Sequence, residues 1–426
     1  METIEAYLAR KHQELQLLNR CLRRPHALPA PRSVMEVVRH KFQLTAALKA
    51  EHALSDWTAT ETAWADAGDH RAGPFAFSYD YQRADLDVRG PSFYAAGESR
   101  HDTIYTISGM AAIAALLLAT RPVLGPAHLL MLPGSYGETQ ELVAAHARHL
   151  RPVTLTRDLA ALAQRSPAPR LLLIDSSATA PRFEAVLSCD RPAIDLLIFD
   201  TTCFANGSGR IRRVLAWARR WDVPVVMVRS HTKLDSLGAE YGRLGSVAFI
   251  DWSKAGAAGR VVLRALPDET RNAVRLLGGA ALPAHFPPYV GLPAYRELTA
   301  RRVAAILRNS RRARRHFATT LRGLTAELDF AHGLYVTLAG RAPLDEATAR
   351  QAATAMSDDL RRAGLPIRHA GSFGFDFAAT EWFHDATTDR YSVRVAVPDL
   401  PTAIWDELTE AIAAWWSAHP GRSAAA

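Results

Sequence analysis

One lysine in this chain stands where it could do chemistry. Lys233 follows the apolar run VVMVR (225–229), which reads as a buried strand. Two hydroxyl residues, Ser230 and Thr232, lie between the run and the lysine. The chain has only five lysines, and lysine is seldom buried without a function. The pattern therefore indicates a functional amine, although it also fits a lysine that extends from a strand end into solvent.

The chemistry that these residue types suit is that of a phosphate-bearing aldehyde. A lysine amine can form a Schiff base with a carbonyl compound, and neighbouring hydroxyls can hold a phosphate. A lysine at a strand end between such hydroxyls is what an enzyme that uses pyridoxal 5'-phosphate requires. Lys233 is thus the first candidate catalytic residue, with Ser230 and Thr232 as cofactor ligands.

A second candidate element is a helix start in SGMAAIA (108–114). The backbone amides of Gly109 and Met110 would point at a ligand there, and the positive end of the helix dipole favours an anion. Ser108 before the helix also fits a simple N-cap without a ligand.

A carboxylate ends another apolar run, IDLLIFD (194–200), at Asp200. Ligands of open α/β sheets bind outside the carboxyl ends of the strands, which is where Asp200 would lie. An acid at this position could hold the protonated ring nitrogen of pyridoxal phosphate. The alternative is a cap on the turn that follows the strand.

Short apolar strands alternating with helical segments must position these residues. Several of the strands are apolar on both faces, which is typical of a sheet covered by helices on both sides. The pattern predicts an α/β fold with a mostly parallel, doubly wound sheet. The seven predicted strands are 128–132, 153–155, 171–175, 196–200, 225–229, 247–250 and 261–265.

Three parts of the chain differ in their pattern of predicted helices, strands and loops. Residues 1–75 predict an N-terminal helical arm, 76–282 the large cofactor-binding α/β domain, and 283–426 a smaller C-terminal α+β domain. The last part should contain helices at about 294–322, 344–363 and 401–418, with strands at 333–338 and 391–397.

Composition limits the partners. The formal charge is +8, and 46 of the 51 basic residues are arginine. Arginines recur at helical spacing in 301–317, but no aromatic residues interleave with them, which favours a solvated helix face over a nucleic-acid surface. The longest apolar run, 110–119, is too short to span a membrane. We therefore expect neither nucleic acid nor membrane as a partner.

The three cysteines, Cys21, Cys189 and Cys203, are odd in number and far apart. They suit neither a disulfide framework nor a zinc site, and no other metal site is expected. The first twenty residues carry charges throughout, unlike a signal peptide. The sequence predicts a cytoplasmic protein.

Taken in order, five short motifs resemble the Cys/Met metabolism family of pyridoxal phosphate enzymes, which includes cystathionine synthases and lyases and methionine γ-lyase. The motifs are SGMAAI (108–113), SYGET (135–139), DTTCF (200–204), SHTK (230–233) and RYSV (390–393). The resemblance covers roughly residues 75–400 and implies an aspartate-aminotransferase-like fold, known as fold type I, with pyridoxal 5'-phosphate as cofactor.

By position, the resemblance implies roles at the cofactor. Lys233 would be the Schiff-base lysine and the base at Cα, and Asp200 would hold the pyridinium nitrogen. Ser230, Thr232 and the amides of Gly109 and Met110 would hold the phosphate. Tyr136 would stack on the cofactor ring and assist the leaving group.

The resemblance also implies roles at the substrate and at a subunit interface. Arg390 would bind the substrate α-carboxylate as a bidentate fork, with Ser372 beside it. Tyr81 and Arg83 would reach the phosphate of a neighbouring subunit, which implies a homodimer or homotetramer with shared active sites. A polar surface loop is the alternative for Tyr81 and Arg83.

Several residues depart from the family pattern. Thr179 stands where the family has an asparagine near the phenolic oxygen, and Leu234 where an aromatic residue follows the lysine. Arg394 replaces a small residue, and the intervals after Asp200 and Ser372 differ in length. These differences indicate a specialised pocket, in keeping with natural-product biosynthesis.

The expected reaction is γ-replacement or γ-elimination on a small amino-acid substrate. Its γ leaving group could be an O-acyl group, a halide or the sulfonium of S-adenosylmethionine. An aminotransferase or β-eliminating lyase would use the same cofactor residues, and so would a carbon–carbon bond-forming enzyme of the same fold. A non-catalytic binding protein that retains the fold is the remaining alternative.

Overall fold

The computed structural model describes residues 1–56, 70–79, 86–94, 101–155, 159–175, 177–250, 257–325, 333–385 and 388–419. These residues fall into two compact units. The first unit contains Met1–Leu48, Lys233–Glu240 and Leu292–Ala426, and the second contains Lys49–Thr232 and Tyr241–Gly291. Lys233 and Ser372 therefore belong to the first unit, whereas Asp200, Ser230 and Thr232 belong to the second. The predicted domain ranges stay predictions.

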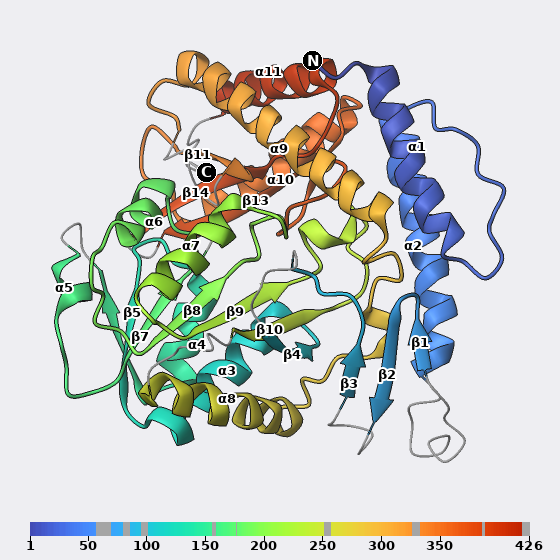
Figure 1. Ribbon diagram of the computed structural model, residues 1–426. Helices are drawn as coiled ribbons and strands as arrows, with labels where there is room; N and C mark the ends of the chain where they lie inside the picture. The colour runs from blue at the N-terminus through green and yellow to red at the C-terminus, as the bar shows by residue number, and fades with distance from the viewer. Residues whose placement is uncertain are drawn as a thin grey trace. The chain divides into compact units, whose positions relative to one another are not determined.

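The second unit is built on a seven-stranded sheet, most of whose strands are labelled in Figure 1. Only β10 runs against the others, because it pairs antiparallel with both of its neighbours. The predicted α/β class with a mostly parallel sheet is confirmed. In spatial order the strands are β4 (His101–Thr106), β10 (Gly245–Ile250), β9 (Val225–Ser230), β8 (Leu196–Asp200), β7 (Arg170–Ile174), β5 (Ala127–Met131) and β6 (Leu150–Thr154).

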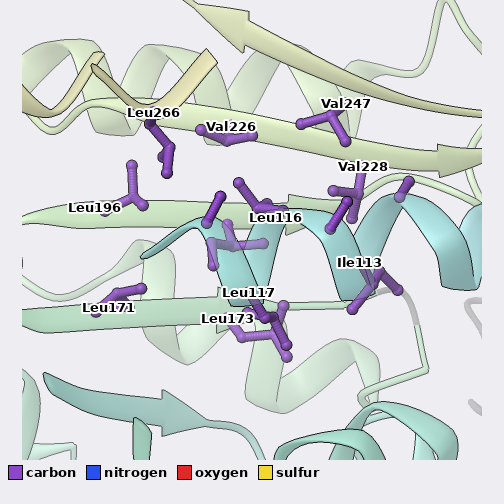
Figure 2. Close-up of a cluster of buried hydrophobic side chains, with 14 of the residues drawn as sticks. Ile113, Leu116, Leu117, Leu171, Leu173, Leu196, Val226, Val228, Val247 and Leu266 are labelled. Atoms are coloured by element: carbon purple, nitrogen blue, oxygen red, sulfur yellow. The ribbon is translucent and has the colours of Figure 1, made fainter. Parts of the chain in front are cut away.

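Helices cover both faces of this sheet, because the strand side chains that point to either face are mostly apolar. One core contains residues of α3, α4 and α8, and the other contains residues of α5, α6 and α7. Figure 2 shows Ile113, Leu116 and Leu117 of α3 among strand residues such as Leu173 and Val228. The helices are α3 (Gly109–Leu124), α4 (Gly137–His146), α5 (Ala160–Ala163), α6 (Ala180–Leu187), α7 (Gly209–Arg220) and α8 (Ala257–Leu276), with a short turn η4 (Pro283–His285).

One predicted strand is wrong and another was missed. Residues 261–265 lie within α8, where the buried residues Leu266, Thr270 and Val274 recur every four positions, as on one helix face. The seventh strand is β4 instead. Its sequence, HDTIYT, is polar because an edge strand pairs on one side only, so an apolar pattern could not reveal it.

The second unit also has a three-stranded antiparallel sheet, formed by β1 (His70–Ala72), β2 (Phe75–Tyr79) and β3 (Leu86–Arg89). The sequence around it shows no clear period, and these strands were not predicted. Phe75 and Phe77 of β2 are buried and contact Phe286, so aromatic packing replaces an aliphatic pattern here.

The first unit combines helices with a four-stranded sheet of order β11-β14-β13-β12. The predicted α+β character of the C-terminal part is confirmed. Its strands are β11 (Tyr335–Leu338), β12 (Ile367–His369), β13 (Ala378–Asp385) and β14 (Arg390–Ala396). Its helices are α1 (Ile4–Arg20), α9 (Pro293–Thr320), α10 (Glu346–Arg362) and α11 (Thr402–Ala418), with the turn η3 (Leu234–Ser236) and the first part of α2 (Val34–Asp56).

The arginine-rich stretch 301–317 lies on α9, and it is not a uniformly solvated face. Arg301 is 45% exposed, whereas Arg302 next to it is 3% exposed and bonded to buried carboxylates. The expectation of a solvated face is therefore wrong for Arg302, because helical spacing alone turns neighbouring residues to different sides. None of the helices that the structure describes is long and apolar enough to cross a membrane.

Candidate active site

A helix start and two hydroxyls lie close together in the second unit. Ser108 is the N-cap of α3, and its Oγ accepts the N–H of Ala111 at 3.0 Å. A Cβ on Gly109 would lie 2.8 Å from the Cβ of Ser230, so only glycine allows this close approach. Ser230 Oγ and Thr232 Oγ1 are 2.9 Å apart and hydrogen-bonded. The helix dipole and the two hydroxyls together suit an anion.

Met110 would contribute to this group of donors through its backbone. Its side chain packs against the core beneath α3, which leaves the amide as the group that can face a ligand. The four predicted phosphate ligands in this unit are therefore neighbours around the start of α3. The N–H of Ser230 donates to Thr202 Oγ1 at 3.0 Å, which fixes the backbone of Ser230.

Asp200 ends β8 and is buried, with 8% of its surface exposed. Its Oδ1 accepts the N–H of Thr202 at 2.8 Å. Burial raises the pKa of this carboxyl above its ordinary value, while the bonds from Thr202 and the charge of Arg229 act in the opposite direction. Since burial dominates, a further positive charge beside Asp200 would stabilise its ionised form.

Asp175 is a second buried acid at this edge of the sheet, and sequence reasoning missed it. It follows β7, the strand next to β8, and is 2% exposed. Its Oδ2 accepts the N–H of Tyr136 at 2.8 Å, and its Oδ1 accepts the N–H of Ser177 at 2.8 Å. Burial raises its pKa to about 6, and the neighbouring charge of Asp200 adds to the shift. The available signal was an acid ending an apolar run, as at Asp200.

Tyr136 and Thr179 both stand at helix starts on this edge. Tyr136 is half-buried at the N-cap of α4, and its backbone is tied to Asp175. Thr179 is the N-cap of α6 and is 9% exposed, and its side chain makes no capping hydrogen bond. Asp175 thus holds the backbone of Tyr136, the predicted ring-stacking residue. It also comes shortly before Thr179, the predicted neighbour of the cofactor's phenolic oxygen.

Arg229, the last residue before Ser230, is a second buried group that the sequence did not single out. It is 1% exposed, and its Nη1 donates to the carbonyls of Thr201 at 2.7 Å and Phe204 at 2.8 Å. These bonds hold the loop after Asp200. An arginine at the end of an otherwise apolar run was the signal that could have found it.

In the first unit, the structure brings Lys233 and Ser372 together. Lys233 Nζ donates to Ser372 Oγ at 2.5 Å and lies 5.8 Å from the ring centre of Phe373. Ser372 is 7% exposed, and Lys233 is half-buried. The solvent-directed alternative for Lys233 does not describe this amine, which is directed at a buried hydroxyl.

Two arginines on β14 differ in their surroundings. Arg390, the predicted carboxylate ligand, is exposed at the first residue of the strand. Arg394 is 12% exposed, bonds to Glu381 at 2.7 Å, and lies 4.6 Å from the ring centre of Tyr335. The ring of Tyr335 contacts that of Phe373, beside Lys233. Through these two rings, Arg394 is linked to Lys233.

Two predicted residues, Tyr81 and Arg83, lie outside the residues that the structure describes. Within the described ranges, no group of three or more His, Cys, Asp or Glu side chains is arranged to hold a metal ion.

No protein-family model and no curated protein matches the chain. Among solved structures, it is similar to an aspartate aminotransferase from Trypanosoma cruzi, at 12% identity over 76% of this chain and 80% of that chain, with a TM-score of 0.46. It is also similar to a serine palmitoyltransferase from Sphingomonas wittichii, at 16% identity over 74% and 72%, with a TM-score of 0.49. These likenesses concern the fold, and at such scores they carry no argument about function.

Proposed function

We propose that the chain binds pyridoxal 5'-phosphate and uses Lys233 as its Schiff-base lysine in the conversion of an amino acid. The observation that carries the proposal is the hydrogen bond that Lys233 Nζ donates to Ser372 Oγ. The hydrogen-bonded hydroxyl pair of Ser230 and Thr232 comes immediately before this lysine. Lys233 is the next residue in the chain after Thr232. A phosphate held by that pair would therefore be bound within a few residues of the amine.

The residues present fit this cofactor. Gly109 lets the start of α3 pack closely against Ser230, so the donors suited to a phosphate, a helix start and two hydroxyls, lie near one another. Asp200 is a buried carboxyl whose pKa burial raises, which suits an acid that pairs with a protonated ring nitrogen. When bound, pyridoxal phosphate supplies an electron sink for carbanion chemistry at Cα.

The chain's own groups would then divide the work. Lys233 would remove the Cα proton, and Ser372 Oγ would orient its amine. Tyr136 would lie against the cofactor ring and exclude water, with its backbone fixed by Asp175. For the substrate carboxylate, we favour Arg394 over Arg390, because aromatic contacts link Arg394 to the surroundings of Lys233.

For the reaction, we propose γ-replacement or γ-elimination on an amino acid with a γ leaving group, such as an O-acyl homoserine or S-adenosylmethionine. The support is the resemblance of the motifs around Gly109, Tyr136, Asp200 and Lys233 to those of the Cys/Met metabolism family. Transamination and β-elimination need the same cofactor residues and are the second candidate. A homodimer or homotetramer with shared sites remains part of the proposal, through Tyr81 and Arg83.

The test is a visible absorbance spectrum of the purified protein with added cofactor, followed by titration with a panel of amino acids. A yellow protein whose band moves to longer wavelength with one γ-substituted amino acid supports the proposal. Product analysis separates the candidates, because β-elimination gives pyruvate and ammonia and transamination gives a keto acid with pyridoxamine phosphate. A band that no amino acid perturbs favours a binding protein without turnover. Among variants, Arg394→Lys should raise the KM more than Arg390→Lys does.

A further inference from the structure

Seven charged side chains form a buried cluster in the first unit, which we call the charge network. None of the seven is more than 3% exposed. Four are cations and three are carboxylates, and Glu2 at the edge pairs with one of the cations. The members are Arg10, Lys11 and Glu14 of α1, Lys41 of α2, Arg302 of α9, and Asp376 and Asp399 beside the four-stranded sheet.

The network fixes the segment 371–377, which contains Ser372. Asp376 Oδ1 is 2.5 Å from both Lys11 Nζ and Arg302 Nη1, and Lys41 Nζ bonds to Asp376 Oδ2 at 2.7 Å. The same guanidinium of Arg302 donates through Nη2 to the carbonyl of Gly374 at 2.7 Å. A carboxylate shared by three cations cannot move without leaving buried charges unpaired.

The network also fixes the segment 234–240, which follows Lys233. Lys41 Nζ donates to the carbonyl of Leu237 at 2.7 Å, where the backbone is left-handed with φ of +52°. At Gly238, φ is +79°, and a Cβ would lie 2.6 Å from Arg302 Nη2. A strained backbone, as at Leu237, persists only when its surroundings hold it, and here the bond from Lys41 does so, while Arg302 packs closely against Gly238.

Three consecutive residues of the first segment contact Lys233. Ser372 accepts its amine, Phe373 places a ring 5.8 Å from Nζ, and Gly374 packs against its backbone. A Cβ on Gly374 would lie 3.1 Å from the carbonyl oxygen of Lys233, and φ of Gly374 is +87°. The position of Lys233 therefore depends on where this segment lies.

We propose that the charge network positions Lys233. Arg302 connects the network to the segment beside Lys233 through its hydrogen bond to the Gly374 carbonyl. The network residues of the N-terminal helices, more than 190 positions before Lys233 in sequence, would therefore help to position the reactive amine. The purpose of this positioning rests on the proposed function. The contacts that position Lys233 do not depend on what the lysine reacts with.

The test compares Arg302→Lys with Arg10→Lys. Both changes keep the positive charge in the network, and both remove a guanidinium that also holds a backbone carbonyl, Gly374 for Arg302 and Asp399 for Arg10. Arg10 contacts neither segment around Lys233 in the bonds described for it. The two variants therefore share the structural cost and differ in the link to Lys233.

The readout is the rate at which acetic anhydride acetylates Lys233 in the full chain without added cofactor, measured by peptide mass spectrometry with exposed Lys49 as internal reference. Arg302→Lys should raise this rate by about tenfold, since the hydrogen bond to Ser372 is no longer held in place. Arg10→Lys should leave it within about twofold of the wild type.

Equal rates in both variants at similar thermal stability would overturn the inference, because the network would then be structural alone. The assay does not depend on the proposed function. If the wild type takes up no pyridoxal phosphate, the function fails while the acetylation result still decides the positioning role. A second variant, Lys41→Met, which removes the bond to Leu237, should raise the rate in the same direction.

Discussion

Two groups of buried acids in this molecule have pKa values that are shifted in opposite directions from their ordinary values. In the second unit, burial raises the pKa of Asp175 and Asp200. In the first unit, Glu14, Asp376 and Asp399 are equally buried, yet the pKa of each is lowered. Burial opposes ionisation in all five, so the difference comes from the lysines and arginines that contact the first-unit acids at 2.5 to 3.3 Å.

The comparison separates a structural site from a candidate functional one. The charge network compensates its own carboxylates and needs nothing from outside. The pair Asp175 and Asp200 carries a desolvation cost that its hydrogen bonds and Arg229 do not offset. A cationic group bound beside Asp200 would offset it, and a protonated pyridine ring is such a group. Uncompensated burial at a sheet edge is therefore the electrostatic mark of the proposed site.

The largest expected effect comes from breaking the compensated group. Glu14→Gln removes a carboxylate that four cations contact, Arg10, Lys11, Lys41 and Arg302. We expect a loss of about 3–5 kcal/mol in the free energy of unfolding, because four buried cations are left with only two buried carboxylates, Asp376 and Asp399, to offset their charge. Urea unfolding measures it.

The control is Glu346→Gln, which breaks a half-exposed pair with Arg350 on α10. It should cost no more than about 0.5 kcal/mol. If Glu14→Gln cost no more than this control, the network would not be a compensated buried group.

The next effect concerns the uncompensated pair and depends on pH. Burial raises the pKa of Asp175 from 3.8 to about 6, so its ionisation destabilises the fold increasingly as the pH rises from about 4 to about 6. The full cost is about 3 kcal/mol. Asp175→Asn removes this titration. Between pH 4 and pH 7, the unfolding free energy of the variant should therefore gain about 3 kcal/mol on the wild type, without cofactor. Parallel stability curves would contradict the assignment.

The smallest expected effect sharpens the role of Asp200. Asp200→Asn keeps the shape and a hydrogen-bonding oxygen but cannot neutralise a protonated ring nitrogen. We expect about tenfold weaker retention of pyridoxal phosphate, or about 1.4 kcal/mol. Equilibrium titration by absorbance measures this. Asp190→Asn, at a carboxylate 78% exposed in the same unit, should bind as the wild type does. An unchanged affinity in Asp200→Asn would mean that Asp200 does not pair with a protonated ring nitrogen.

Much of the frame could be predicted from the sequence, because both faces of the large sheet are covered and its strands are continuous apolar runs. The errors have local causes. Residues 261–265 have a strand-like composition but belong to α8, whose buried residues recur at helical spacing from Leu266 onward, and the edge strand β4 has a single core aliphatic residue, Ile104, among polar neighbours. The aromatic strands β1 to β3 pack through rings, which no simple period describes.

The candidate site was predicted in part. Ser108, Gly109, Ser230 and Thr232 lie together because a strand end and a helix start are local features that short motifs reveal. Asp175 and Arg229 were missed, because their importance lies in burial and in backbone partners at the start of α4 and after β8. The charge network could not be predicted, since it joins residues up to 389 positions apart in sequence.

The central claim is that Lys233 carries pyridoxal phosphate, and chemical trapping tests it most directly. Protein incubated with the cofactor is reduced with borohydride, digested, and analysed by mass spectrometry. We predict that the reduced cofactor is found on the peptide containing Lys233, and that Lys233→Ala loses both this label and the visible band. A label on one of the other four lysines, or a protein that stays colourless with the cofactor present, would contradict the account.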